Sequence, residues 1–268
     1  MLIMEPFRKS LIAITLLSVF LTEASALTLA YLYALEADVE ALKEAGATLV
    51  RSEAVGDRTL RVYRVGAHTL IAAQMGSGQT ESAVSAEMIL ARRAVDAVVS
   101  TGVAGALDEQ FAVGKTVMVE SIFAWQAGSF RDGAWAETPR SRPRITPWLP
   151  AAWDLPRAGV ASGDVFVADD GERERLRSAT GMPLIDMNLQ GIQNAANAHS
   201  LPALHLRVVS DRAGSAASEE FRQFTRGYRG DLARRLVEWL RMLPADVESP
   251  SKYPALQRLT QPTAQPQG

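Results

Sequence analysis

Short apolar runs alternate with helical segments along most of this 268-residue chain. The runs Leu27–Leu35, Val95–Leu107 and Pro202–Asp211 are as long as typical buried strands and carry few charges. The segments Gly76–Ala94 and Asn188–Ser200 carry apolar residues at helical spacing. Strands that alternate with helices form a sheet with helices packed on both faces. The pattern therefore predicts an α/β fold.

Other segments add detail to this prediction. The pattern of Leu60–Met75 predicts two strands joined by a tight turn at Gly66. The strand that follows Val95 is expected to end in a glycine-rich loop that includes Gly102. The stretch Gly128–Arg157 is rich in Pro, Trp and Arg without any period, so we expect a long loop. The helical period of Ser218–Leu243 predicts a single closing helix.

Composition limits the classes of function. Apolar residues make up 47% of the chain and charged residues 22%, as in an ordinary globular protein. The formal net charge of −2 gives no support for a nucleic-acid partner. The chain has no cysteine, which excludes disulfides, thiolate nucleophiles and zinc–cysteine sites. His68, His199 and His205 lack the spacing of metal ligands, so we expect no metal.

The first 26 residues have the pattern of a secretory signal peptide. Two basic residues precede the apolar run Leu11–Leu21, and the small residues Ala24–Ala26 match a cleavage site. This pattern predicts a periplasmic or secreted protein with no membrane span after cleavage, because the run is short for a bilayer. A mis-assigned start codon or a buried first strand is the alternative.

The predicted domain is 27–243, and the Pro/Gln-rich tail 244–268 is expected to be disordered.

Ligands of α/β sheets bind beyond the carboxyl ends of the strands, and polar residues gather there in this chain. Asp211 ends an apolar strand, where partial burial would raise its pKa and let it hold a proton near neutral pH. It is alternatively an N-cap of the next helix. Arg207 should lie on the same face of this strand as Asp211. Because a buried charge needs a partner, Asp186 is the candidate for Arg207.

Two further groups of residues are candidates for a binding site. Asn188 stands at the start of a helix, where an amide is either a cap or a ligand-binding group. The residues Gly76–Thr80 place backbone N–H groups at a helix N-terminus, which suits an anion or a hydroxyl-rich ligand, or else they form only a structural turn. Gly102 would let the backbone approach a flat ligand closely.

A set of motifs connects these features. In order along the chain, the motifs are YALEADVEAL, MGSGQTESAVSAEMIL, VDAVVSTGVAGAL followed by VGKTVMVES, GVASGDVFV, IDMNLQGI and LRVVSDRAG. Together they resemble the nucleoside phosphorylase/hydrolase superfamily from about Leu27 to Leu243, and above all its methylthioadenosine/S-adenosylhomocysteine nucleosidases. The resemblance implies a single-domain three-layer sandwich, with a mixed central β-sheet flanked by helices, and a homodimer.

The resemblance also implies catalytic residues. Asp211 matches the acid that protonates N7 of a purine as the glycosidic bond breaks. Asp38 matches the residue that positions the attacking water, and Arg207 with Asp186 matches a charged pair behind that water. Carboxylates near the sugar stabilise a transition state that resembles an oxocarbenium ion. This scheme requires no metal and no organic cofactor.

The substrate-binding residues follow from the same resemblance. Phe166 and Val167 match positions that hold the base through ring stacking and backbone polar groups. Phe221 matches an aromatic residue near the ribose, and Met187 matches a residue that packs against it. These positions imply that a purine nucleoside is the small-molecule partner.

The chain departs from the family pattern at the sugar. Asn188 stands where the family usually has a glutamate that accepts hydrogen bonds from the ribose hydroxyls. An amide oxygen still accepts, but a charged hydrogen bond is about twice as strong. Asp38 and Asp186 are each one methylene shorter than the glutamates of the family. These differences affect the substrate prediction more than the fold prediction.

Three functions remain open. The favoured one is an exported purine-nucleoside N-glycosidase that uses water, on a methylthioadenosine, adenosylhomocysteine or related nucleoside. A phosphate-dependent phosphorylase is the first alternative, since the loop with Ser77 and Gly78 faces the ribose or, in phosphorylases, the phosphate. That loop has no arginine, and Ser100 stands where some members have one. A non-catalytic nucleoside-binding or storage protein of the same fold is the second alternative.

Overall fold

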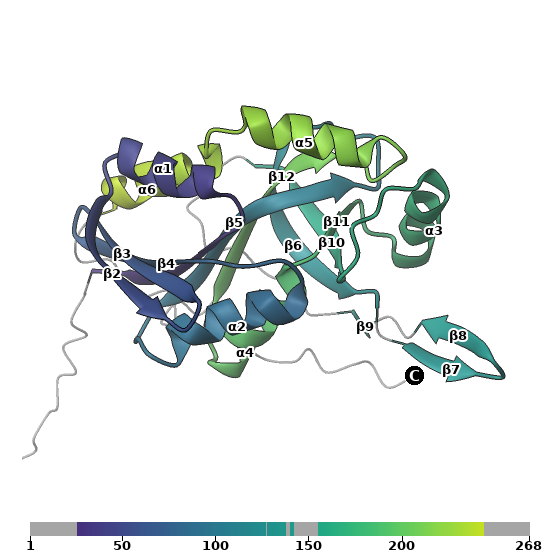
Figure 1. Cartoon of the computed structure of the whole chain (residues 1–268), viewed down its shortest axis with the longest axis horizontal. Coiled ribbons are helices and arrows are strands. Elements are labelled where there is room, and N and C mark those ends of the chain that lie inside the picture. Colours follow the sequence, from purple (N-terminus) through teal and green to yellow (C-terminus); the bar gives the residue numbers. More distant parts are fainter. Residues whose placement is uncertain (1–25, 127, 138–139, 142–154, 244–268) are drawn as a thin grey trace, which may run out of the picture.

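The computed structural model describes residues 26–126, 128–137, 140–141 and 155–243. Within them the main sheet mixes parallel and antiparallel strands (Figure 1). Strand β9 (Arg140–Ser141) pairs with β6 beside the main path. In spatial order, the other strands are β11 (Leu184–Asp186), β10 (Arg157–Ser162), β6 (Thr116–Ala124), β12 (Ala203–Asp211), β5 (Ala97–Ala106), β1 (Thr28–Tyr33), β4 (His68–Gln74), β3 (Arg58–Val65) and β2 (Thr48–Val55).

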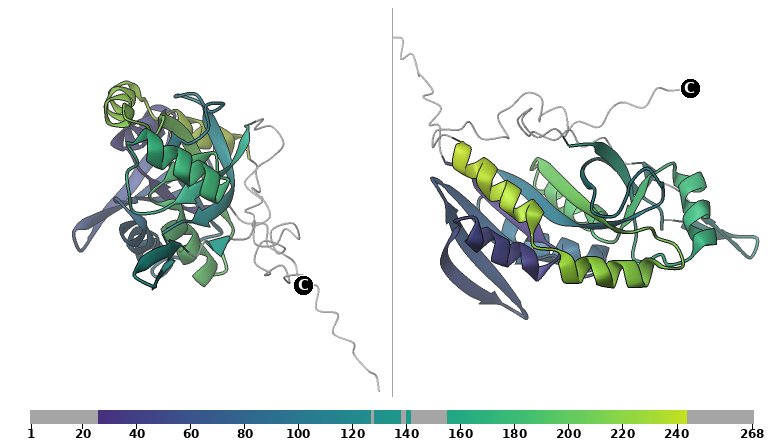
Figure 2. Two further views of the ribbon diagram at one scale, coloured as in Figure 1. Left: turned by 90° about the vertical axis from the view of Figure 1, so that its right-hand side faces the viewer. Right: turned by 90° about the horizontal axis from the view of Figure 1, so that it is seen from above.

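Helices cover both faces of this sheet. On one face lie α1, α5 and α6, and on the other lie α2 and α4, with α3 near the edge that holds β10 and β11 (Figures 1 and 2). This arrangement confirms the predicted three-layer sandwich. The helices are α1 (Glu36–Glu44), α2 (Gln79–Leu90), α3 (Asp170–Thr180), α4 (Leu189–Ala198), α5 (Ala217–Gly227) and α6 (Asp231–Met242).

One half of the sheet closes on itself. Strand β11 pairs in parallel with β10 and also antiparallel with the end of β5, where Ile185 is opposite Gly105. The path β11–β10–β6–β12–β5 therefore returns to β11. This closure brings Asp186, the last residue of β11, beside the carboxyl ends of β5 and β12.

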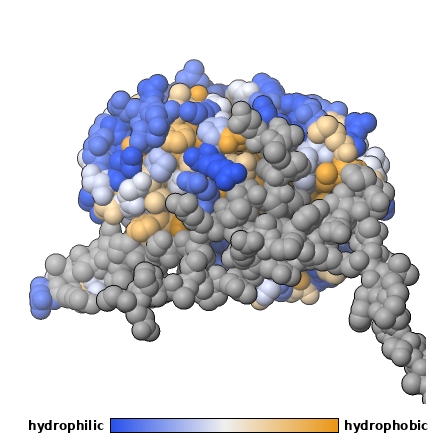
Figure 3. All heavy atoms as spheres, turned by 180° about the vertical axis from the view of Figure 1, so that it is seen from behind, coloured by the Kyte–Doolittle hydropathy of each residue, from blue (hydrophilic) through white to orange (hydrophobic). Residues whose placement is uncertain are grey.

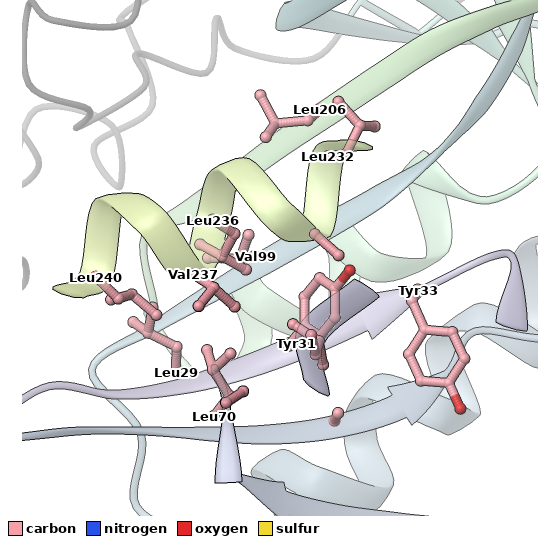
Figure 4. Close-up of a cluster of buried hydrophobic side chains, with 14 of the residues drawn as sticks. Leu29, Tyr31, Tyr33, Leu70, Val99, Leu206, Leu232, Leu236, Val237 and Leu240 are labelled. Atoms are coloured by element: carbon pink, nitrogen blue, oxygen red, sulfur yellow. The ribbon is translucent and has the colours of Figure 1, made fainter. Parts of the chain in front are cut away.

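Two large clusters of core residues lie on opposite faces of the sheet, and two smaller clusters lie in the half that closes on itself. Strand residues such as Leu29 and Tyr31 pack against Leu236 of α6 (Figure 4). On the opposite face, Val98 of β5 packs with Ile192 of α4 and with residues of α2. Each fully buried aliphatic side chain contributes about 1.5–3 kcal/mol relative to its exposed state. These clusters hold the strand ends, and hence the site, in fixed positions.

The prediction of a glycine-rich loop that includes Gly102 is wrong, because β5 continues through Gly102 and Gly105 to Ala106. Its neighbours β12 and β11 both hydrogen-bond to this stretch. The glycines are needed for close packing: a Cβ on Gly105 would lie only 2.9 Å from an oxygen of Asp211. These glycines are therefore strand residues that make room for side chains of the site.

The prediction of one closing helix over Ser218–Leu243 is also wrong, because α5 and α6 are separate helices. The chain turns between them at Gly230, which has a left-handed φ of 72°. A Cβ there would lie 2.4 Å from both the carbonyl oxygen of Ala37 and the Cβ of Ala41 in α1. Only glycine combines this conformation with this close approach. The turn places Tyr228 under α1.

Four strands, β2, β7, β8 and β9, were not predicted. Strand β2 is an edge strand with mostly exposed residues, so its sequence lacks the apolar alternation that marks a half-buried strand. In the predicted long loop Gly128–Arg157, β7 (Gly128–Arg131) and β8 (Ala134–Glu137) form a hairpin. The hairpin β3–β4 with its turn at Gly66 is confirmed.

Three predicted segments lie wholly or partly outside the described residues. They are 1–25 of the predicted signal peptide, 142–154 of the predicted loop and the predicted tail 244–268. Seen from behind, the described residues present mainly hydrophilic side chains along the upper part of the molecule (Figure 3). None of the helices described has the length and apolar character required to cross a bilayer.

Candidate active site

A cavity of about 360 Å³ opens at the carboxyl ends of β1, β4, β5, β10, β11 and β12. Ligand sites of α/β sheets occur at this end of the strands. Four predicted site residues, Asp38, Gly78, Gly102 and Arg207, are not among those that line it. The predicted residues that do line it are Ser77, Phe166, Val167, Asp186, Met187, Asn188, Asp211 and Phe221.

Asp211 is one of two buried acids that line this cavity, with only 2% of its surface exposed. The Ser210 hydroxyl donates to its Oδ2 at 2.7 Å, and the Ala213 N–H donates to its Oδ1 at 2.9 Å. Burial raises the pKa of Asp211, and these hydrogen bonds oppose the rise only in part. The alternative role as an N-cap is excluded, since α5 begins later, with Ala216 at its N-cap position. Asp211 is therefore placed to hold a proton beside a ligand.

Two aromatic rings form one wall of the cavity. Phe166 lies in the loop after β10, and Phe221 lies on α5. Their ring centroids are 5.8 Å apart and the rings meet edge to face at 70°. Phe166 remains 42% exposed, so its ring face is free to stack on a flat ligand. The neighbouring Val167 is buried and lines the same cavity.

Asp186 and Arg207 form the predicted charged pair, which is confirmed. The Nε and Nη2 of Arg207 donate to Oδ2 of Asp186 at 3.1 and 3.0 Å. Both side chains are 1% exposed, so the pair is almost completely removed from water. The Leu189 N–H also donates to the Asp186 carboxylate, which satisfies part of the N-terminus of α4. The pair joins β11, β12 and α4.

The expectation that Arg207 and Asp211 lie on one face of β12 is wrong. The pairing register of β12 with β5 shifts between Val209 and Asp211, which breaks the alternation of side chains. Arg207 packs over Gly102, whereas Asp211 packs over Gly105. Those glycines are three residues apart on β5 and so belong to opposite faces of the strand. The bulge thus turns Asp211 into the cavity and leaves Arg207 behind it.

Asn188 does not cap its helix. It occupies the N-cap position of α4, but its side chain makes no capping hydrogen bond. Instead its amide nitrogen donates to the carbonyl of Gly76 at 3.0 Å and to the hydroxyl of Ser82 at 2.6 Å. Asn188 therefore holds the glycine loop after β4 against the start of α4.

The glycine loop at the start of α2 is partly occupied by the protein itself. The Gln79 N–H donates to Oδ1 of Asp164 at 2.5 Å. Gly78 has a φ of 92°, and a Cβ there would lie 3.0 Å from the same oxygen. The expected anion position at this helix N-terminus is thus taken by a carboxylate of the loop after β10. Ser77, which lines the cavity, is exposed.

Asp38 lies behind the cavity with 1% of its surface exposed. Its Oδ1 accepts from the hydroxyl of Tyr228 at 2.9 Å, and its Oδ2 accepts from Thr101 at 3.0 Å. Burial raises the pKa of Asp38 to about 6, although both hydrogen bonds favour the charged form. Each carboxylate oxygen can accept a second hydrogen bond, so contact with a water is not blocked by these donors. Positioning of that water by Asp38 stays a prediction.

Sequence reasoning missed three residues that shape this site. Ser210 precedes the acid in the VVSD motif and donates to it. Asp164 follows Gly163 in the SGD motif and binds the start of α2. No sequence pattern marked Tyr228 as a site residue. It reaches Asp38 because α5 and α6 are separated by a turn at Gly230.

The described residues hold no cluster of three or more His, Asp or Glu side chains that could bind a metal. The polar groups that face the cavity are carboxylates, hydroxyls, amides and backbone groups. Such a set suits an uncharged polar ligand with a flat aromatic part, which the rings of Phe166 and Phe221 would contact.

Known proteins of similar sequence include two nucleosidases. The 5'-methylthioadenosine/S-adenosylhomocysteine nucleosidase of Tolumonas auensis is 22% identical over 224 residues, covering 77% of this chain and 91% of the relative. The aminodeoxyfutalosine nucleosidase of Campylobacter jejuni is 24% identical over 171 residues, covering 59% and 74%.

A solved structure shows the same fold. The S-adenosylhomocysteine nucleosidase from Streptococcus pyogenes, in complex with 5-methylthiotubericidin, superposes with a TM-score of 0.70 at 24% identity. The match covers 82% of this chain and 98% of that protein. Residues 28–241 match the sequence model of the phosphorylase superfamily. Because that match spans most of the sequence, including every strand end that builds the cavity, the chain belongs to the phosphorylase superfamily.

Proposed function

We propose that the protein is a purine-nucleoside N-glycosidase, which hydrolyses the bond between the base and the ribose. The observation that carries this proposal is Asp211, a buried carboxyl with a raised pKa that faces a cavity with an aromatic wall. An acid of this kind can protonate a base as it leaves. The relatives with nucleosidase names support the same reaction.

The proposed reaction assigns a role to each of these groups. The base stacks on Phe166, and the protonated Asp211 gives its proton to N7 of the purine while the C1'–N9 bond breaks. The bonding electrons go to the base, which leaves as a neutral purine. A water molecule adds its oxygen to C1', and its released proton returns to the Asp211 carboxylate or to solvent. The products are the free base and the free pentose.

Water is favoured over phosphate as the acceptor. The described residues that line the cavity include no Arg, Lys or His. The nearest buried cation, Arg207, is already neutralised by Asp186. The N–H of Gln79, at the start of α2, is taken by Asp164. The lining residues therefore offer a phosphate dianion no side-chain cation, and one N–H donor at the start of α2 is already taken.

The proposed substrate class is an adenine nucleoside of the methylthioadenosine or adenosylhomocysteine type, or a related nucleoside. The names of the relatives support this class, since two different nucleosidases are similar to this chain. Asn188 and Ser77 occupy the sugar end in this proposal, and Phe221 and Met187 contact the ribose or its substituent.

The test is base release by the purified chain with adenosine, inosine and methylthioadenosine, each with and without phosphate. Release that does not require phosphate supports the hydrolase, and a requirement for phosphate favours the phosphorylase alternative. Asp211→Asn should lower kcat by about 10²- to 10⁴-fold, because general acid catalysis is lost. Binding without release in both proteins would favour the nucleoside-binding alternative.

We also propose export and a homodimer, as the sequence predicts. Export rests on the pattern of residues 1–26. Fractionation of cells that express the full chain, followed by N-terminal sequencing, would reveal cleavage after Ala26 if export occurs. Sedimentation equilibrium of the purified protein would measure the oligomeric state.

A further inference from the structure

A buried histidine, His205, lies on β12 outside the cavity lining and with none of its surface exposed. Its Nδ1 is 2.8 Å from the hydroxyl oxygen of Ser100 on β5, and its Nε2 is 3.0 Å from Oε1 of Gln193 on α4. Ser100 is also fully buried, and its oxygen accepts from Nη1 of Arg207 at 3.2 Å. These four residues, Arg207, Ser100, His205 and Gln193, form the His205 network, a continuous line of hydrogen bonds from β12 to α4.

The protons of the His205 network follow one order. The amide nitrogen of Gln193 donates to Oδ1 of Asn197 at 2.8 Å, so its oxygen faces His205 and must accept. Burial and the nearby charge of Arg207 lower the pKa of His205 well below its ordinary value, so the ring is neutral and carries its one proton on Nε2. Nδ1 then accepts the proton of Ser100, whose lone pairs are left for Arg207. Every donor points from Arg207 toward α4, an order in which hydrogen bonds strengthen one another.

This order fixes the guanidinium of Arg207 on both sides. Its Nη1 donates to Ser100 and to the Leu206 carbonyl at 2.9 Å, while Nε and Nη2 donate to Oδ2 of Asp186. Among the described residues, the other oxygen of Asp186, Oδ1, accepts only from the Leu189 N–H, at 3.3 Å and shared with Oδ2. Because Asp186 lines the cavity, Oδ1 is the oxygen with capacity left for a ligand.

From this geometry we propose that His205 and Ser100 are positioning residues, which act through Arg207 to hold the Asp186 carboxylate in the orientation that leaves Oδ1 to the cavity. The effect on catalysis rests on the proposed function, in which positive charge develops at C1' as the bond to the base breaks. A carboxylate whose position is fixed before the reaction stabilises that charge without a cost of reorganisation. Since neither positioning residue lines the cavity, their loss should affect the transition state more than substrate binding.

The first test measures the network directly and requires no activity. Nitrogen NMR of the purified chain with labelled histidine reports which ring nitrogen carries the proton. The signals of His205 are identified among those of the three histidines by their loss in His205→Asn. We expect the proton on Nε2 at pH 7. A proton on Nδ1 would reverse the order of the donors, and this result overturns the proposal.

Variants of the two positioning residues test their effect on catalysis. Ser100→Ala and His205→Leu should each lower kcat by about tenfold, the upper effect of one ordinary hydrogen bond, with KM within about threefold of wild type. His205→Asn keeps an amide oxygen near the place of Nδ1 and should retain kcat within about threefold. The matched control is Ser85→Ala, which removes another fully buried serine that accepts from an arginine, Arg58, but lies outside the cavity lining. The control should keep kcat and KM within about twofold of wild type.

The double variant Ser100→Ala with His205→Leu distinguishes positioning from a general loss of packing. If both residues act through Arg207, the double variant should lose no more kcat than the larger single loss, whereas independent packing defects multiply. Melting temperatures show whether each variant is folded. Multiplied losses, or a wild-type kcat in folded Ser100→Ala, overturn the proposal. If His205→Leu does not fold, the comparison of Ser100→Ala with Ser85→Ala decides.

Hydrogen exchange at Arg207 separates this proposal from the proposed function. The Nε–H of Arg207, whose NMR signal is identified with Arg207→Lys, should exchange about tenfold faster in Ser100→Ala and stay within about threefold of wild type in His205→Asn. If the wild-type chain releases no base from any nucleoside, the N-glycosidase proposal fails while this exchange still decides whether the network holds Arg207. Unchanged exchange in folded Ser100→Ala overturns the positioning proposal.

Discussion

The phenol of Tyr228 donates a 2.9 Å hydrogen bond to the carboxylate of Asp38. This contact joins the turn between α5 and α6 to the first turn of α1. Tyr228 is buried, and its OH also accepts from the Leu232 N–H at 3.3 Å. The turn at Gly230 thereby holds the Tyr228 hydroxyl against Asp38, the carboxylate behind the cavity.

Gly230→Ala should lower the free energy of unfolding by more than about 2 kcal/mol. Alanine is strained at the positive φ, and its Cβ would overlap Ala37 and Ala41. Urea unfolding measures this change. Gly227→Ala is the matched control, because nothing lies within 4 Å of that Cβ and its change should stay under about 1 kcal/mol. Equal effects of the two substitutions would contradict the proposed close packing of α1 on the turn.

Asp38 should make stability depend on pH. Its folded pKa of about 6 lies above the ordinary value of 3.8, so the folded state favours the neutral form. The contribution to stability is full below about pH 4 and is lost as the pH rises through about 6, a change of roughly 3 kcal/mol. Asp38→Asn should remove this loss. Urea unfolding at several pH values, compared between the two proteins, measures the difference, and parallel curves would contradict the prediction.

The Asp186–Arg207 pair should be sensitive to the loss of one partner. Arg207→Met should lower the free energy of unfolding by about 3–5 kcal/mol, because it leaves a buried carboxylate uncompensated. The double variant Asp186→Asn with Arg207→Met should recover part of this loss. The matched control is Arg222→Met, which removes an exposed pair with Glu219 and should change stability by less than about 1 kcal/mol. A loss as small as the control's would show that the pair is not buried in solution.

Ser210→Ala should change the pH dependence of base release. The Ser210 hydroxyl favours the charged form of Asp211 and so lowers its pKa. Without that donor the pKa of Asp211 rises, and the acid stays protonated to a higher pH. The alkaline limb of kcat/KM should therefore move to higher pH. The control substitution Ser210→Thr keeps a hydroxyl and should keep the wild-type limb. Movement of the limb to lower pH in the alanine variant would argue against Asp211 as the acid.

The sequence determined the fold class and eight of the seventeen residues that line the cavity. Alternating apolar runs and helical segments predict the layers because burial on both faces leaves a continuous apolar signal in each strand. The position of ligand sites at strand ends points to Asp211 from the residues themselves. Asn188 is a candidate because it stands at a helix start, and Phe166 follows from the resemblance to the superfamily. Asp186 is paired correctly with Arg207 because a charge in an apolar strand needs a partner.

The tertiary structure decided which predicted residues face the cavity. The bulge before Asp211 separates it from Arg207, and bulges depend on pairing with a neighbour rather than on local sequence. Closure of β11 on β5 decided where Asp186 lies. The turn at Gly230 brought Tyr228 to Asp38, although the two are 190 residues apart along the chain. Periodicity along one segment carries information about burial, while contacts between distant segments depend on how the buried elements pack.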